Sequence, residues 1–223
     1  RCGVVDDTGE EIFADKMGVI LARDLIGLHP GATFVADVKS TGLFAADPVL
    51  VAGGAKADYW KTGHSHMKRR VAELGALAGF EKSGHYFLAP PIGKGYDDGL
   101  RVAVEIAKLM DRNPGRSLSD LRRALPVTYA TPTMSPACPD EEKYAVIERL
   151  QTRLVAMARE GEPLGPLPIQ TVVTVNGARV MLEGGAWALV RASSNTPNLV
   201  VVCESPASRE ELRAIFEALD AVI

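Results

Sequence analysis

The stretch TFVADVKSTG, residues 33–42, decides the fold of the first part of the chain. Residues 33–38 are apolar and partly β-branched, as in a strand that is buried on both faces. Apolar side chains recur at helical spacing before it, over residues 11–28, and Pro30-Gly31 ends that helix. Another helix follows it, beginning at Asp47-Pro48. A buried strand between helices predicts an α/β layer, with ligand-binding residues at the carboxyl ends of the strands.

The same alternation continues to about residue 123. The patterns predict strands at residues 3–6 and 57–60, a strand, a polar loop and a second strand within 79–89, and helices at 65–77, 97–110 and 117–124. We therefore expect a three-layer α/β/α domain over residues 11–123.

The rest of the chain follows a different pattern. Residues 126–139 contain four prolines without periodicity, so we expect the domain linker there. A long helix should follow Asp140, and Asn176-Gly177 predicts a hairpin between strands 171–175 and 178–182. Strands at 186–190 and 199–203 and a helix at 207–221 complete the pattern. Residues 124–223 should form a smaller α+β domain with an antiparallel sheet.

Composition excludes several classes of protein. The chain is 47% hydrophobic and 24% charged, with a net charge of −3, so it has no general attraction to nucleic acid or to a membrane. It contains neither an apolar run of membrane-spanning length nor a signal-peptide pattern. Three well-separated cysteines form neither a disulfide framework nor a CxxC metal pair. A reducing cytoplasm is the expected location.

Two polar loops carry most of the chemistry. The loop FEKSGH, residues 80–85, combines the carboxylate of Glu81, the hydroxyl of Ser83 and the imidazole of His85, and Gly84 lets the backbone turn. These groups suit a polyhydroxylated ligand, and we call residues 80–85 the sugar loop.

The second loop is RASSNTP, residues 191–197. The guanidinium of Arg191 binds phosphate bidentately, and the side chains of Ser193, Ser194 and Asn195 would complete a phosphate cradle. We call residues 191–197 the phosphate loop. A solvated polar connector between two strands is the alternative at this point.

Other polar residues follow the first strands. Lys39 follows the buried strand, where it would bind an anion or exchange a proton, and Thr62-Gly63-His64 leads into a helix whose free amides suit an anion. Plain surface roles remain open for these residues. A zinc site formed by three of the histidines is disfavoured, because the chain offers no cysteine partner. For Asp97-Asp98 we favour helix capping over metal binding.

With these residues identified, the chain resembles the α-D-phosphohexomutases, in particular the bacterial phosphomannomutase/phosphoglucomutase type. The resemblance covers essentially the whole chain. It rests on four motifs in order, which are DVKSTG with Lys39, KTGHS with Thr62, Gly63 and His64, EKSGH with Glu81, Ser83 and His85, and the phosphate loop.

The resemblance implies that the chain is the C-terminal half of a four-domain enzyme. Residues 1–10 would be the closing strand of a preceding domain, residues 11–123 the sugar-binding third domain, and residues 124–223 a fourth domain of TBP-like fold. Arg1 resembles the last residue of the DGDGDR loop that binds Mg²⁺ in this family. We therefore expect no metal ligands in this chain, and we expect its partners to be phosphorylated hexoses and the N-terminal domains.

The implied reaction interconverts hexose 1-phosphate and 6-phosphate through a hexose 1,6-bisphosphate, with a phosphoserine outside this chain as donor. Lys39 or His64 would transfer protons or neutralise charge, and Thr62, Gly63 and the two loops would bind substrate. Phe80 and Ser194 depart from the usual family motifs. A non-catalytic phosphosugar-binding module and a phosphoglucosamine mutase remain alternatives. A sugar kinase or phosphatase is disfavoured, because the chain has no P-loop. The chain alone should be inactive.

Overall fold

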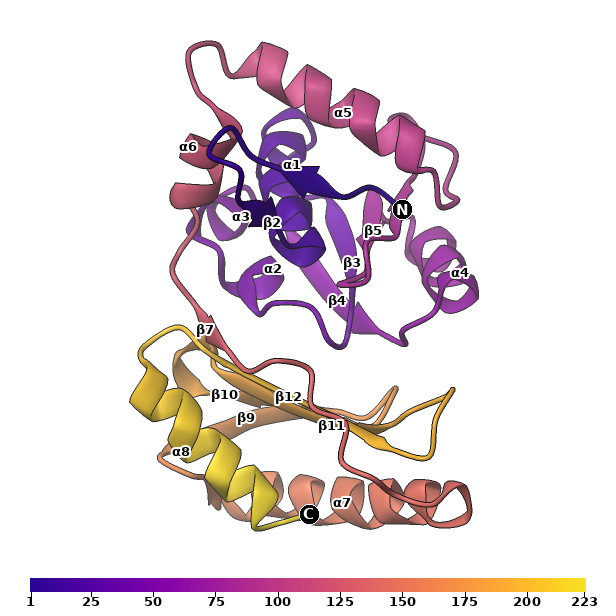
Figure 1. Cartoon of the computed structure of the whole chain (residues 1–223), viewed down its shortest axis with the longest axis vertical. Helices are drawn as coiled ribbons and strands as arrows, with labels where there is room; N and C mark the ends of the chain where they lie inside the picture. The colour runs from indigo at the N-terminus through magenta and orange to yellow at the C-terminus, as the bar shows by residue number, and fades with distance from the viewer. The chain divides into compact units, whose positions relative to one another are not determined.

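The computed structural model describes all 223 residues, which form two compact units, Arg1–Pro126 and Val127–Ile223 (Figure 1). We describe each unit by itself. No helix in either unit combines the length and the apolar character that are needed to cross a bilayer.

Unit 1 is built on a four-stranded sheet of order β4-β3-β5-β6. Its strands are β3 (Thr33–Asp37), β4 (Lys56–Trp60), β5 (Ala78–Phe80) and β6 (Tyr86–Leu88). β3 pairs in parallel with both β4 and β5, whereas β5 and β6 are antiparallel. Because β3, β4 and β5 point the same way, the loops that follow them meet at one edge of the sheet.

Helices cover both faces of this sheet, which confirms the predicted three layers. They are α1 (Ala14–Leu28), α2 (Leu43–Ala46), α3 (Pro48–Ala52), α4 (His64–Leu74), α5 (Gly99–Arg112) and α6 (Leu118–Arg123). On one face, Met67 and Val71 of α4 pack with Val35 of β3. On the other face, the buried ring of Phe80 stacks on Phe44 of α2 at 5.2 Å.

The N-terminal segment forms a short hairpin of β1 (Val4–Val5) and β2 (Glu11–Ile12). The first helix therefore begins at Ala14, later than predicted, because Glu11–Ile12 pairs with β1. The hairpin turn binds α6, since Asp6 accepts a hydrogen bond from Arg122 Nε at 2.7 Å and Asp7 accepts two bonds from Ser119 at 3.0 Å. That residues 1–10 close the sheet of a preceding domain remains a prediction.

Unit 2 contains a six-stranded sheet of order β7-β12-β11-β10-β9-β8, antiparallel throughout. The strands are β7 (Tyr129–Ala130), β8 (Pro163–Leu164), β9 (Leu167–Val173), β10 (Ala178–Leu182), β11 (Trp187–Ala192) and β12 (Leu199–Ser205). The hairpin predicted at Asn176-Gly177 is confirmed as β9-β10. Its first strand begins earlier than predicted, at Leu167.

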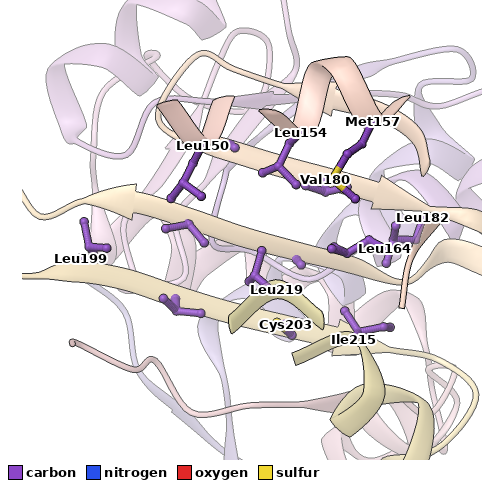
Figure 2. Packing of buried hydrophobic residues seen from close by; sticks show 14 of the residues in the cluster. Leu150, Leu154, Met157, Leu164, Val180, Leu182, Leu199, Cys203, Ile215 and Leu219 are labelled. Carbon is purple, nitrogen blue, oxygen red and sulfur yellow. The ribbon is translucent and has the colours of Figure 1, made fainter. Parts of the chain in front are cut away.

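Two helices, α7 (Asp140–Glu160) and α8 (Arg209–Asp220), pack on one face of this sheet. Figure 2 shows Leu154 of α7 and Leu219 of α8 above Val180 and Cys203 of the strands. Burial raises the pKa of the Cys203 thiol to about 12, and all three cysteines of the chain are free. The predicted α+β architecture with an antiparallel sheet is confirmed.

The proline-rich segment differs from the predicted linker. Two of its residues form β7, and Met134 and Ala137 make isolated bridges to Val201 and Asn198. An edge position tolerates proline, because an edge strand donates hydrogen bonds on one side only. The boundary between the units lies between Pro126 and Val127, at the start of this segment, and the rest of the segment belongs to unit 2.

Candidate functional site

A buried aspartate organises the carboxyl edge of the sheet in unit 1. Asp37 ends β3 and is fully buried. Its Oδ1 accepts hydrogen bonds from Ser40 Oγ at 2.5 Å and from the backbone N–H of Lys82 at 3.2 Å. Its Oδ2 accepts a bond from Thr62 Oγ1 at 3.0 Å. One carboxylate thus holds three loops together. No motif in the sequence pointed to Asp37, although a charged residue at the end of an apolar strand is a usable signal.

Glu81 is the central acceptor of the sugar loop. It is 2% exposed, and its two carboxylate oxygens accept bonds from the Gly63 N–H at 3.2 Å and from Ser83 Oγ at 3.0 Å. Burial, and secondly the nearby charge of Asp37, raise the pKa of the Glu81 carboxyl. Gly63 adopts φ +123°, which favours glycine at the position that links Thr62 to α4. The predicted residues Thr62, Gly63, Glu81 and Ser83 are therefore joined in one hydrogen-bonded network.

The imidazole of His85 has a distinct partner at each nitrogen. Nδ1 lies 2.5 Å from Asp97 Oδ2, and Nε2 lies 3.0 Å from Arg1 Nε. Because a guanidinium only donates, Nε2 is the acceptor and the proton of the neutral ring belongs on Nδ1, facing the carboxylate. A histidine held in this way presents a lone pair at Nε2.

The prediction that Asp97 and Asp98 both serve as helix caps was wrong for Asp97. Asp98 is the N-cap of α5 and accepts a bond from the Arg101 N–H at 3.0 Å. Asp97 instead accepts a bond from the Tyr86 N–H at 3.2 Å through the oxygen that does not face His85. A helix has one N-cap position, so the second carboxylate was available for another partner.

The two predicted catalytic residues have different surroundings. Lys39 Nζ lies 3.7 Å from Asp37 Oδ2, and 17% of its side chain is exposed, so it belongs to the network at the sheet edge. His64 begins α4, is exposed, and has its Nδ1 3.1 Å from Ser65 Oγ. Both follow strands that end at the same edge.

The phosphate loop is the connection between β11 and β12 of unit 2. Arg191 lies within β11 and not in the loop proper, and its Nη1 donates to the Ala192 carbonyl at 2.9 Å. Ser193 N–H donates to the Asn198 carbonyl at 2.9 Å, and Ser193 Oγ lies 2.8 Å from Thr196 Oγ1. Ser194 and Asn195 are exposed and form the tip of the loop.

The turn between β9 and β10 lies beside Arg191. Gly177 has φ +80°, and a Cβ at this position would collide with the Val190 carbonyl and with the backbone of Arg191. Gln151 of α7 fixes this turn by donating to the carbonyls of Gly177 at 2.7 Å and of Thr174 at 3.0 Å. A glycine is therefore required where the turn approaches the base of the phosphate loop.

The chain brings together no group of three or more histidine, cysteine, aspartate or glutamate side chains that could hold a metal ion. His64, His66 and His85 accordingly do not form a zinc site. The Mg²⁺ that the family resemblance implies stays a prediction, and the residues of this chain do not fit that ion.

Family models cover both units. A model of phosphoglucomutase/phosphomannomutase, alpha/beta/alpha domain III, matches residues 13–129, and a model of the C-terminal domain matches residues 137–222. The chain belongs to the phosphoglucomutase/phosphomannomutase family. It is similar to the phosphomannomutase/phosphoglucomutase of Pseudomonas putida, with 33% identity over 97% of this chain and 44% of that protein. The Pseudomonas aeruginosa protein of the same name is 35% identical over 96% of this chain and 43% of its own length.

A solved structure supports the same family. The phosphoglucomutase/phosphomannomutase family protein of Burkholderia thailandensis aligns with a TM-score of 0.80 and 29% identity, over 99% of this chain and 44% of that one. The chain thus spans less than half the length of the relatives it matches, and it corresponds to the C-terminal half of a phosphohexomutase.

Proposed function

We propose that this chain is the sugar- and phosphate-binding half of an enzyme that interconverts hexose 1-phosphate and hexose 6-phosphate, with mannose and glucose as the sugars. The reaction would pass through a hexose 1,6-bisphosphate. The observation that carries the proposal is the buried Glu81 network, which lies at the carboxyl edge of a sheet in a chain whose family consists of phosphohexomutases. In this role unit 1 takes the sugar and unit 2 takes a phosphate group.

Glu81 is suited to hold sugar hydroxyls. An ionised carboxylate has about four acceptor sites, of which Gly63 and Ser83 occupy one on each oxygen. The remaining lone pairs accept bonds from two neighbouring hydroxyls of a hexose. Because Gly63 and Ser83 fix the plane of the carboxylate, these acceptors are oriented before the sugar arrives.

His85 is better placed than His64 to take a proton from a hydroxyl that attacks phosphorus. Its Nδ1–H faces Asp97, so Nε2 is the basic nitrogen, and the carboxylate stabilises the imidazolium that forms. The substrate hydroxyl would displace the guanidinium of Arg1 from Nε2. Lys39, as an ammonium beside Asp37, carries no lone pair, so we assign it to charge neutralisation near the reacting oxygen.

The phosphate loop would hold the phosphate that is not reacting. Arg191 supplies a charged donor, and Ser194 and Asn195 supply side chains at the exposed tip. Thr196 and Ser193 bond each other through their hydroxyls, so we assign them first to the shape of the loop, with the Ser193 hydroxyl at the base of the phosphate. Such a site accepts the phosphate from either end of the sugar, as a mutase requires.

The complete enzyme would use Mg²⁺ and a phosphoserine supplied by other domains, and we propose a cytoplasmic location. By itself the chain would bind phosphosugars without turnover. Turnover by the purified chain after addition of Mg²⁺ and glucose 1,6-bisphosphate would contradict this part of the proposal.

The test of the function uses the natural protein that carries this chain. Phosphorus NMR follows the conversion of mannose 1-phosphate, glucose 1-phosphate and glucosamine 1-phosphate to their 6-phosphates. We expect conversion of the first two, and its loss in Glu81→Gln and Arg191→Ala. Conversion of glucosamine 1-phosphate alone would indicate a phosphoglucosamine mutase. Binding without any conversion would indicate a phosphosugar-binding module.

A further inference from the structure

Lys143 is a buried cation behind the phosphate loop. It lies in the first turn of α7, and only 4% of its side chain is exposed. Its Nζ lies 3.1 Å from the Thr196 carbonyl and 2.5 Å from Asp140 Oδ1. Lysine is rarely buried to this extent without partners, because removing an ammonium from water is costly. The Asp140 carboxylate and the Thr196 carbonyl offset this cost, so the buried side chain is bonded directly to the phosphate loop.

The rear of the phosphate loop is attached to the segment that leads into α7. The Cys138 N–H donates to the Pro197 carbonyl at 2.9 Å, and Asn198 Nδ2 donates to the Ser135 carbonyl at 2.8 Å. Lys143 adds a charged donor to the carbonyl of Thr196, the residue just before these two points of attachment. The loop's outward face, with Ser194 and Asn195, makes no part of these contacts.

We propose that Lys143 is a positioning residue that holds residues 193–198 in the conformation that accepts phosphate. The inference rests on the proposed function of the loop. A loop that is fixed before binding loses less conformational entropy when the ligand arrives, and this raises affinity without any new contact to the ligand.

The alternative is that Lys143 only forms a helical ion pair with Asp140, three residues earlier. The two roles are separable, because the Asp140 side chain is 66% exposed and bonds to Lys143 but not to the loop. Asp140→Asn removes the ion pair and keeps the bond from Lys143 to Thr196. Lys143→Met removes both and keeps an unbranched side chain that is one atom shorter. Arg153→Met removes an exposed cation from the same helix and controls for net charge.

The experiment measures two quantities on the 223-residue chain and its three variants. Amide hydrogen exchange at Ser193 and Asn198, whose N–H groups bond within the loop, reports loop order without ligand. Titration with glucose 1,6-bisphosphate and with inorganic phosphate reports affinity. For Lys143→Met we expect about tenfold faster exchange and about five- to tenfold weaker binding of both ligands, as for loss of one charged hydrogen bond that acts indirectly. Asp140→Asn and Arg153→Met should change neither.

Unchanged exchange at Ser193 and Asn198 in Lys143→Met would overturn the proposal, as would equal effects of Asp140→Asn. Faster exchange with unchanged affinity would overturn it too, because the loop would then bind phosphate regardless of its order. If the parent chain binds neither ligand while Lys143→Met loosens the loop, the proposed function fails and the anchoring role of Lys143 stands.

Discussion

Asp97→Asn should reverse the tautomer of His85. In the parent chain, Asp97 Oδ1 accepts from the Tyr86 N–H and Oδ2 faces His85 Nδ1. The Tyr86 N–H only donates, so the single oxygen of an asparagine must stay with Tyr86. The amide Nδ2–H2 group then faces His85, where it donates to Nδ1. The ring proton moves to Nε2, where it displaces the Arg1 Nε–H, and the nitrogen that we propose as the general base loses its lone pair.

The size of the effect follows from the bond that is lost. A hydrogen bond to a charged group contributes about 1.5–3 kcal/mol, which is roughly a 10- to 150-fold preference for the Nδ1–H form. Proton–nitrogen correlation NMR of the labelled imidazole measures the tautomer directly in the isolated chain. In the complete enzyme, loss of the general base should lower kcat by about 100- to 10,000-fold with a smaller change in KM.

Asp98→Asn is the matched control, because asparagine is an equally good N-cap for α5 and leaves His85 untouched. The reasoning is refuted if Asp97→Asn keeps the proton on Nδ1. It also fails if both variants lower kcat equally, since the loss would then come from α5 and not from the imidazole.

Three further predictions concern stability and loop geometry. Because burial raises the pKa of Glu81 in the folded state, the ionised form destabilises the fold above the unfolded pKa of about 4.3. Glu81→Gln should therefore raise the melting temperature at neutral pH, and this gain should disappear as the pH falls toward about 4.3. An equal gain in melting temperature at neutral and at acid pH would point to a cause other than ionisation. Gly177→Ala should destabilise unit 2 by about 1–3 kcal/mol in urea unfolding and weaken phosphate binding, since its Cβ meets the Arg191 backbone. Gly184→Ala has a similar φ of +76° with open space around it, so it should show the backbone strain without the loss of binding. Hydrogen bonds from Ser119 lower the pKa of Asp7, so its contribution to stability is present above the unfolded pKa of about 3.9 and is lost as the pH falls. Asp7→Asn should flatten the acid dependence of the unfolding free energy below about pH 4, and an unchanged dependence would remove Asp7 from the acid response.

The sequence by itself determined the order of the elements and the residues of both loops. Apolar periodicity and turn residues depend on local backbone geometry, so β3, the β9-β10 hairpin and the long helix α7 could be read from neighbouring residues. Parallel strands with loops at their carboxyl ends then implied that Lys39, Thr62 and Glu81 share one edge. The family resemblance came from the same local motifs.

Only the tertiary structure decided which groups are partners. The bond from the Lys82 N–H to Asp37 spans 45 residues of sequence, and the bond from Lys143 to Thr196 spans 53. Asp97 could have capped a helix or bonded an imidazole, and it bonds His85 because β6 places that ring beside it. Within the proline-rich segment, residues 129–137 pair with the edge of the sheet at β12 and the residue before it. Such pairings depend on the folded positions of distant segments, and no local pattern of residues encodes them.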